Sequence, residues 1–184
     1  MQREYPEQYQ KIIRLVAGTG IFLRPIKPED ESLIVDLFNS LSKETIHLKF
    51  FSGLKYMPPK QLEKLTHIDY DKQMAIVALI GKGAAGRIVA VGRYTLIDDE
   101  PGAAEFAIVV QDAQQGRGIG TEVLYHLAHV AKLQDVQVIV GYIMNENSRM
   151  FSVLKRSGLK MTKKHWDRGV TRVDIPIDEN VRIQ

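Results

Sequence analysis

Cysteine is absent from the 184-residue chain, which excludes disulfide bonds, thiolate metal sites and a cysteine nucleophile. No apolar run approaches the roughly 20 residues that a helix needs to cross a bilayer. Residues 1–14 are polar and of mixed charge, so they lack the apolar core of a signal peptide. We therefore expect a cytoplasmic location and no membrane partner.

The chain also lacks a strong excess of one charge, because 25 basic residues face 22 acidic ones and leave a net charge of +3. Nucleic-acid binding usually requires a dense basic patch, so no nucleic-acid partner is expected. The length is sufficient for one compact domain with a core, and no repeat or low-complexity linker divides it. We expect a single domain over residues 1–184, with residues 1–20 as a lead-in.

Residues 103–133 form the most informative stretch. An apolar strand ending at Val110 leads into a turn with three glycines, and the helix that follows carries Val123, Leu124 and Leu127 on one stripe. A glycine-rich turn at the start of a helix presents unpaired backbone N–H groups, and the helix dipole adds partial positive charge there. The stretch therefore predicts an anion site, for which phosphate is the usual ligand.

The rest of the chain alternates between strand and helix patterns. Strands are predicted over 21–26, 74–80, 87–97, 103–110, 136–143, 159–162 and 170–175. Helices are predicted over 28–41 and 42–51, from Pro58–Pro59 onward, from the glycine turn to about Leu133, and over 147–157. His165–Arg168 is predicted to be a loop between the last two strands. This order gives an α/β fold with a mixed sheet.

The predicted helix over 42–51 has Ser42 as its N-cap. The link to the next helix is rich in aromatic residues, with Phe50, Phe51 and Tyr56. These side chains could line one wall of a cleft, or they could belong to the core.

Gln115–Gly120 fits the pattern Gln-x-x-Gly-x-Gly between a strand and a helix. This pattern resembles the acyl-CoA-binding signature of the GNAT acetyltransferase superfamily. The order of elements also agrees with the GNAT fold, a mixed, mostly antiparallel sheet with helices on both faces. The Walker motif is excluded because its Lys-Ser/Thr pair is missing. A dinucleotide-binding fingerprint fits less well, because the motif follows antiparallel strands.

The resemblance implies acetyl-CoA as cosubstrate and indicates which residues bind it. The diphosphate would be held by backbone N–H groups of Gln115, Gly116, Arg117, Gly118, Ile119, Gly120 and Thr121. The pantetheine arm would run along backbone groups of Ile108, Val109 and Val110, where this strand splays from its neighbour in GNAT proteins. Asn147 would bond the pantetheine, although a plain helix N-cap explains it equally well.

Many GNAT members place a tyrosine seven residues after this asparagine, where it protonates the leaving thiolate. This chain has Leu154 there. Water or another group must then supply the proton, or the chemistry is weak.

Glu105 is the candidate catalytic residue, because it is a lone acid in an apolar strand. Apolar surroundings are expected to raise the pKa of this carboxyl toward that of a useful base. Such a base could take the proton that an amine must lose to attack a thioester. The alternative is a strand-end glutamate that reaches solvent beside the turn at residues 98–102.

A closer resemblance concerns the acceptor. Tyr5-Pro6, residues 24–30, Leu41-Ser42, Phe50-Phe51 and residues 104–110 look like the GNAT domain of bacterial protein-lysine acetyltransferases. In that group a glutamate on this strand is the general base. The resemblance implies direct acetyl transfer to a protein lysine. The sequence shows no fused acyl-CoA-synthetase-like or nucleotide-sensing domain, which many of these enzymes carry, so regulation stays open.

Two other functions remain open: acetylation of a small amine such as a polyamine or aminoglycoside, and acyl-CoA binding without turnover. A metal is not expected, because His126 and His129 have no third ligand in view. Oligomeric state and acyl-chain preference have no signature in the sequence.

Overall fold

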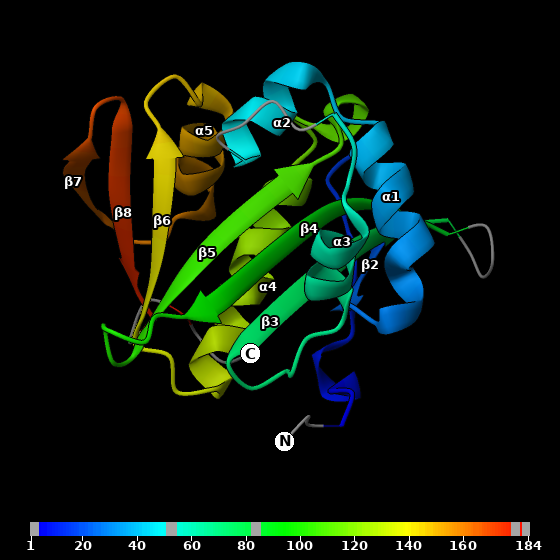
Figure 1. The fold of residues 1–184 in the computed structure, drawn as a ribbon, viewed down its shortest axis with the longest axis horizontal. Helices are drawn as coiled ribbons and strands as arrows, with labels where there is room; N and C mark the ends of the chain where they lie inside the picture. The colour runs from blue at the N-terminus through cyan, green and yellow to red at the C-terminus, as the bar shows by residue number, and fades with distance from the viewer. Residues whose placement is uncertain (1–3, 51–54, 82–85, 178–180, 182–184) are drawn as a thin grey trace.

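The computed structural model describes residues 4–50, 55–81, 86–177 and 181. An eight-stranded sheet runs through the molecule in the order β1-β2-β3-β4-β5-β6-β8-β7 (Figure 1). Its strands are β1 (Lys11–Arg14), β2 (Gly20–Pro25), β3 (Gln73–Ile80), β4 (Arg87–Leu96), β5 (Ala103–Val110), β6 (Val138–Met144), β7 (Thr162–Asp167) and β8 (Val170–Pro176). The helices are α1 (Glu31–Asn39), α2 (Lys43–Phe50), α3 (Pro59–Thr66), α4 (Ile119–Leu133) and α5 (Ser148–Ser157).

Helices cover both faces of this sheet, as predicted. Neighbouring residues on β4 show it, because Gly92 packs against Val123 of α4 whereas Val91 faces a cavity lined by α1. β5 and β6 are parallel, and every other pair of neighbouring strands is antiparallel. The mixed, mostly antiparallel sheet is therefore confirmed. Among the described residues, no helix is long and apolar enough to span a membrane.

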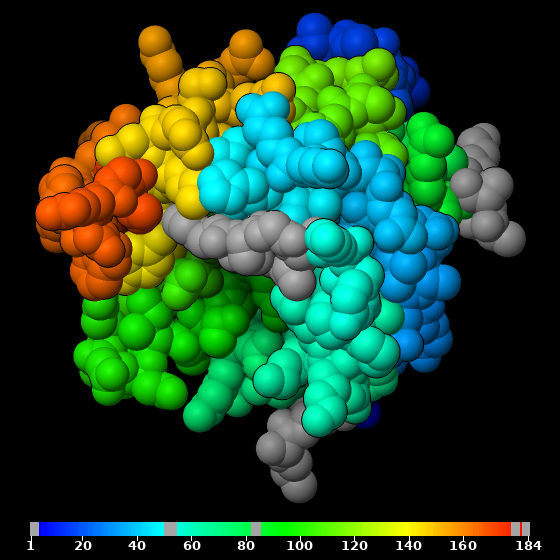
Figure 2. Space-filling model, turned by 45° about the horizontal axis from the view of Figure 1, so that its top comes forward, coloured from blue at the N-terminus to red at the C-terminus, as the bar shows by residue number. Residues whose placement is uncertain are grey.

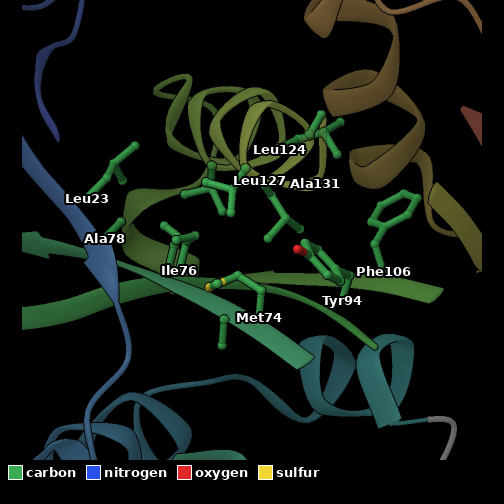
Figure 3. Packing of buried hydrophobic residues seen from close by; sticks show 14 of the residues in the cluster. Leu23, Met74, Ile76, Ala78, Tyr94, Phe106, Leu124, Leu127 and Ala131 are labelled. Atoms are coloured by element: carbon green, nitrogen blue, oxygen red, sulfur yellow. The ribbon is translucent and has the colours of Figure 1, made fainter. Parts of the chain in front are cut away.

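The largest part of the core lies between α4 and the sheet. Leu124 and Leu127, both from the predicted apolar stripe, are fully buried, and Leu127 points toward Ile76 of β3 (Figure 3). Burying one such side chain contributes roughly 1.5–3 kcal/mol to stability. This packing fixes the start of α4, and with it the glycine turn, relative to the end of β5.

A glycine on β4 lets α4 approach the sheet closely. A Cβ at Gly92 would lie 2.5 Å from Cγ1 of Val123, which is fully buried. We expect Gly92→Ala to reduce the free energy of unfolding by about 1–3 kcal/mol through overpacking, as measured by urea denaturation. Adding Val123→Ala should recover part of the loss, giving a favourable coupling energy between the two sites. Strictly additive effects would contradict this close contact.

Two edge strands differ from the prediction. Residues 11–14 form β1, which pairs with β2, although this segment was expected to be only a lead-in. β7 runs from Thr162 to Asp167, so His165 and Trp166 lie in a strand and the predicted loop there is wrong. Both strands are mostly exposed, so neither shows the alternation of buried and exposed residues that reveals a strand in the sequence.

Candidate active site

The sheet opens between its two parallel strands. β5 and β6 pair only over Ala103, Ala104 and Glu105, whereas β5 remains paired with β4 as far as Val110. Beyond Glu105 one edge of β5 is therefore unpaired, and Figure 1 shows the two strands diverging there. The ring of Phe106 packs where a Cβ on Gly141 of β6 would stand, 2.7 Å from that ring. An aromatic side chain thus lies between the strands where their pairing ends.

The glycine turn lies at the open end of this gap. Gly116 and Gly118 have φ values of +77° and +91°, and a Cβ on either would meet no atom within 4 Å. In the described residues, the N–H groups of Gly116, Arg117 and Gly118 donate no hydrogen bond to a protein atom. α4 begins at Ile119, and the first N–H groups of a helix lack partners within it. The predicted set of free donors at a helix start is therefore present.

Two motif residues have structural contacts instead. The Gln115 side chain donates from Nε2 to the carbonyl oxygen of Val110 at 3.0 Å, and its own N–H donates to the Asp112 carbonyl. A Cβ on Gly120 would lie 3.1 Å from Val153 of α5. Gln115 therefore connects the turn to the end of β5, and Gly120 allows close helix packing.

Asp112 joins this turn to α2. Its carboxylate accepts hydrogen bonds from the Ser42 N–H at 2.9 Å, the Ser42 hydroxyl at 2.8 Å and the Thr45 hydroxyl at 2.8 Å. Ser42 Oγ also accepts from the Thr45 N–H at 3.1 Å, which confirms Ser42 as the N-cap. The role of Asp112 was not predicted, because its partners lie about 70 positions away in the sequence.

The hydrogen bonds from Ser42 and Thr45 to the Asp112 carboxylate, here called the Asp112 clamp, should make the free energy of unfolding depend on pH. Burial disfavours the charged carboxylate, but the bonds from Ser42 and Thr45 outweigh that effect and hold the pKa of Asp112 below its usual range. A lowered folded-state pKa stabilises the fold above the unfolded value of about 3.9, and the contribution is lost as pH falls through the folded pKa. Asp112→Asn should therefore cost roughly 1 kcal/mol at pH 7 and much less near pH 2 in urea denaturation. An equal cost at both pH values would contradict the prediction.

α2 also lies beside the segment that links β6 to α5 (Figure 2). Arg149 and Glu44 form an ion pair at 3.9 Å, and His47 Nε2 lies 3.7 Å from Glu146. These side chains are exposed, and exposed pairs contribute little to stability. α2 is therefore held firmly on the side of the glycine turn and only weakly on the side of α5.

Glu105 lies at the last residue pair before the gap, opposite Val140 of β6. Its side chain is exposed, whereas Ala104 and Phe106 on the other face are buried. The expectation of apolar surroundings is therefore wrong, because alternate residues of a strand point to opposite faces. The alternative, a glutamate that reaches solvent, describes the side chain correctly. What still supports Glu105 as a base is its position at the closed end of the gap, where the pairing of β5 with β6 stops.

Two cations lie on the face of the sheet to which Glu105 points. Lys49 of α2 and Arg93 of β4 both line a cavity of about 50 Å³ beneath β5. Burial, together with repulsion from Arg93, lowers the pKa of Lys49 to about 7, and attraction to Glu105 opposes that shift. Burial also lowers the pKa of Arg93. These residues were not singled out in the sequence, where nothing indicates that they meet.

The predicted link of aromatic residues is only partly described. α1, α2 and α3 do line this cavity, through Leu37, Lys49 and Leu65 respectively. Tyr56 is 68% exposed, so it is not a core residue. The side chain of Phe50 and all of Phe51 lie outside the described residues.

Asn147 and Leu154 both lie on α5. The Asn147 Oδ1 accepts from the Met150 N–H at 3.0 Å, so the capping role is confirmed and the amide NH₂ group remains as a donor. Leu154 is fully buried in the core. It carries no group that could exchange a proton.

The histidine pair on α4 serves packing. His126 is buried, and its Nε2 lies 2.7 Å from the Tyr9 carbonyl oxygen. The ring of His129 stacks on it, with centroids 6.3 Å apart. No group of three potential metal ligands occurs within the described part of the chain.

Comparison with known proteins identifies the family. A family model described as the acetyltransferase (GNAT) domain matches residues 21–160. The chain belongs to the GNAT acetyltransferase family. Among solved structures, the GNAT domain of S. lividans PAT is similar at 27% identity with a TM-score of 0.85, covering 94% of this chain and 99% of that one.

Two curated relatives of this GNAT protein match it over only part of their own length. It is 34% identical to acetyltransferase PA5475 of Pseudomonas aeruginosa over an aligned region of 115 residues, and this region covers 62% of this chain and 61% of the relative. It is 28% identical over 165 residues to acetyltransferase Pat of Mycolicibacterium smegmatis, which covers 89% and 48%. The chain thus spans about half to three fifths of the length of the curated relatives it matches.

Proposed function

We propose that this GNAT chain transfers an acetyl group from acetyl-CoA to a primary amine, with a protein lysine as the favoured acceptor. The observation that carries the proposal is the gap between β5 and β6, which has free backbone donors at one end and Glu105 at the other. A thin, extended ligand with an anionic group at one end could bond the unpaired backbone of β5 along its length and the free N–H groups of the glycine turn at that end.

Each part of the site has a task in binding the donor. The free N–H groups of Gly116, Arg117 and Gly118, with the start of α4, would hold the diphosphate. The unpaired edge of β5 over Ile108, Val109 and Val110 would bond the pantetheine arm, and one of its N–H groups would polarise the thioester carbonyl. The NH₂ group of Asn147 would bond the same arm.

The transfer needs one proton acceptor and one proton donor. The amine attacks the thioester carbonyl, a C–N bond forms, the C–S bond breaks, and Glu105 takes the amine proton directly or through water. The thiolate that leaves then receives its proton from water, because Leu154 offers none. Acetyl-CoA supplies the activated acyl group, so no covalent bond to the protein is required.

The surroundings of Glu105 favour a protein acceptor over a polyamine. β7, the edge strand separated from β5 by β6 and β8, is exposed along its whole length, and Trp166 on it is 55% exposed, so this end of the sheet offers an open surface. The neighbouring cavity is lined by Lys49 and Arg93 and by no acidic residue among those described. A polycation would meet repulsion there, whereas a lysine side chain presented by a protein needs only to reach Glu105.

The test is acetyl transfer by the purified chain from acetyl-CoA to lysine peptides and folded proteins, compared with spermidine and an aminoglycoside. Mass spectrometry detects the acetylated product, and thiol release gives the rate. We expect lysine acceptors to be used with the higher kcat/KM. Higher kcat/KM for a small amine would support that acceptor class instead. Tight CoA binding by calorimetry with no transfer to any acceptor would indicate a binding module.

A further inference from the structure

The cavity beneath β5 combines an apolar wall with two cations. It is lined by Ile26, Ile34, Leu37, Phe38, Leu41, Lys49, Met57, Leu65, Val91, Arg93 and Val109. Its volume of about 50 Å³ exceeds the 10–15 Å³ or so that one water molecule requires. It therefore has room for a group of a few heavy atoms.

Neither cation has an anionic partner in the described part of the chain. The Arg93 Nη2 donates to the neutral Oε1 of Gln73 at 3.2 Å, and no carboxylate lies within ion-pair distance of it. The same holds for Lys49, which also makes no hydrogen bond through its side chain to a described residue. Both residues are half-buried, and no counter-charge lies within ion-pair distance of either among the described residues.

The cations lie next to the proposed reaction site. Arg93 pairs in register with Ala107 of β5, between the pairs that contain Glu105 and Val109. All three β5 positions lie on the same face, because they alternate along the strand. Val109 also lines the cavity and belongs to the edge that would bond the donor. A group in the cavity would thus lie beside both the thioester and the attacking amine.

The electrostatics of the cavity favour an anion. Burial and the charge of Arg93 both disfavour the charged form of Lys49, so two like charges lie close together on half-buried residues. Attraction to Glu105 offsets this only in part, because the pKa of Lys49 still falls to about 7. A bound carboxylate would relieve the repulsion and accept charge-assisted hydrogen bonds from both side chains.

We propose that Lys49 and Arg93 bind a carboxylate carried by one of the two substrates, within the reaction proposed above, on which this inference rests. Two sources have the right chemistry. One is the distal carboxylate of a short dicarboxylic acyl group on CoA, such as succinyl. The other is the α-carboxylate of an amino-acid acceptor. The bonds made and broken are the same as in acetyl transfer.

The donor arm of the test measures binding alone. Calorimetry gives the Kd of the purified chain for succinyl-CoA and for acetyl-CoA. The acceptor arm uses acetyl-CoA and compares the kcat/KM for methionine and leucine with that for their α-carboxamides, which lack the negative charge. We expect the wild type to favour the carboxylate-bearing substrate at least tenfold in one arm, and that arm names the source.

Variants link the preference to the two cations. Arg93→Met and Lys49→Met keep the bulk of the side chain and remove the charge, and each should reduce the preference to less than about twofold. Arg14→Met is the matched control, because Arg14 is exposed on β1 at the far edge of the sheet, and it should keep the full preference. Thermal unfolding shows whether each variant is folded. If Arg93→Met does not fold, the result for Lys49→Met alone decides the test.

Two results would overturn the inference: no preference for a carboxylate in either arm, or a preference that survives in both folded variants. The failure of the proposed function is a separate outcome. A chain that binds CoA without any transfer would refute the enzyme proposal, whereas the Kd values of the donor arm would still decide whether the cations bind a carboxylate on the acyl group.

Discussion

Glu105→Gln should lower kcat for acetyl transfer by about 10²–10⁴-fold, the usual contribution of a positioned general base. The amide is close in size to the carboxylate but cannot accept the amine proton at neutral pH. Glu105 is exposed at the last residue pair before the gap, so the substitution removes no core contact. We therefore expect the thermal unfolding midpoint and the Kd for CoA to remain those of the wild type.

The measurement is a steady-state rate with saturating acetyl-CoA, together with calorimetric titration of CoA. Glu63→Gln is the matched control, since Glu63 is exposed on α3 and its side chain makes no hydrogen bond or ion pair to a described residue. It should retain wild-type kcat. Undiminished kcat in Glu105→Gln with intact CoA binding would refute Glu105 as the base.

Gly118→Val should weaken CoA binding by about 10²-fold or more. Gly118 has a φ of +91°, a conformation in which a β-branched residue is a genuine outlier. The turn would have to change shape, and the N–H groups that point at the diphosphate would turn away. Hydrogen bonds to a charged group contribute about 1.5–3 kcal/mol each, so the loss of two gives the expected factor.

Gly18→Val separates this effect from strain alone. Gly18 lies in the turn between β1 and β2, with a φ of +83° and no atom within 4 Å of a Cβ, so it matches Gly118 in conformation and space. Both variants should lose similar stability in urea denaturation, and only Gly118→Val should lose affinity in a CoA titration. Equal CoA affinity in the two variants would show that the turn does not bind the diphosphate.

Local sequence patterns were sufficient to predict the elements at the centre of the fold. The apolar stripe of α4, the glycines before it and the cap at Ser42 depend on residues a few positions apart, where chain geometry alone decides the outcome. The same local patterns gave the order of strands and helices and so the α/β class, whereas the mostly antiparallel sheet was predicted from the resemblance to the GNAT fold.

The rest depends on contacts between distant segments. The orientation of Glu105 follows from the register of β5 against β4 and β6, which the apolar composition of the strand conceals. The cation pair unites α2 with β4, and the Asp112 clamp unites a turn with the start of α2. Such pairings exist only after the sheet has formed, so composition and spacing carry no trace of them.

The free edge of β5 has one more consequence, which concerns aggregation. An unpaired strand edge can recruit a strand from another molecule, and proteins usually protect such edges at the rim of a sheet. Here the edge is inside the sheet, because β6 is still joined to β5 at Ala103–Glu105. A foreign strand, which brings side chains on both faces, would collide with β6, whereas a thin, flexible chain can enter. The pairing of β6 with β5 at Ala103–Glu105 thus keeps strands of other proteins from an edge that stays open to a small ligand.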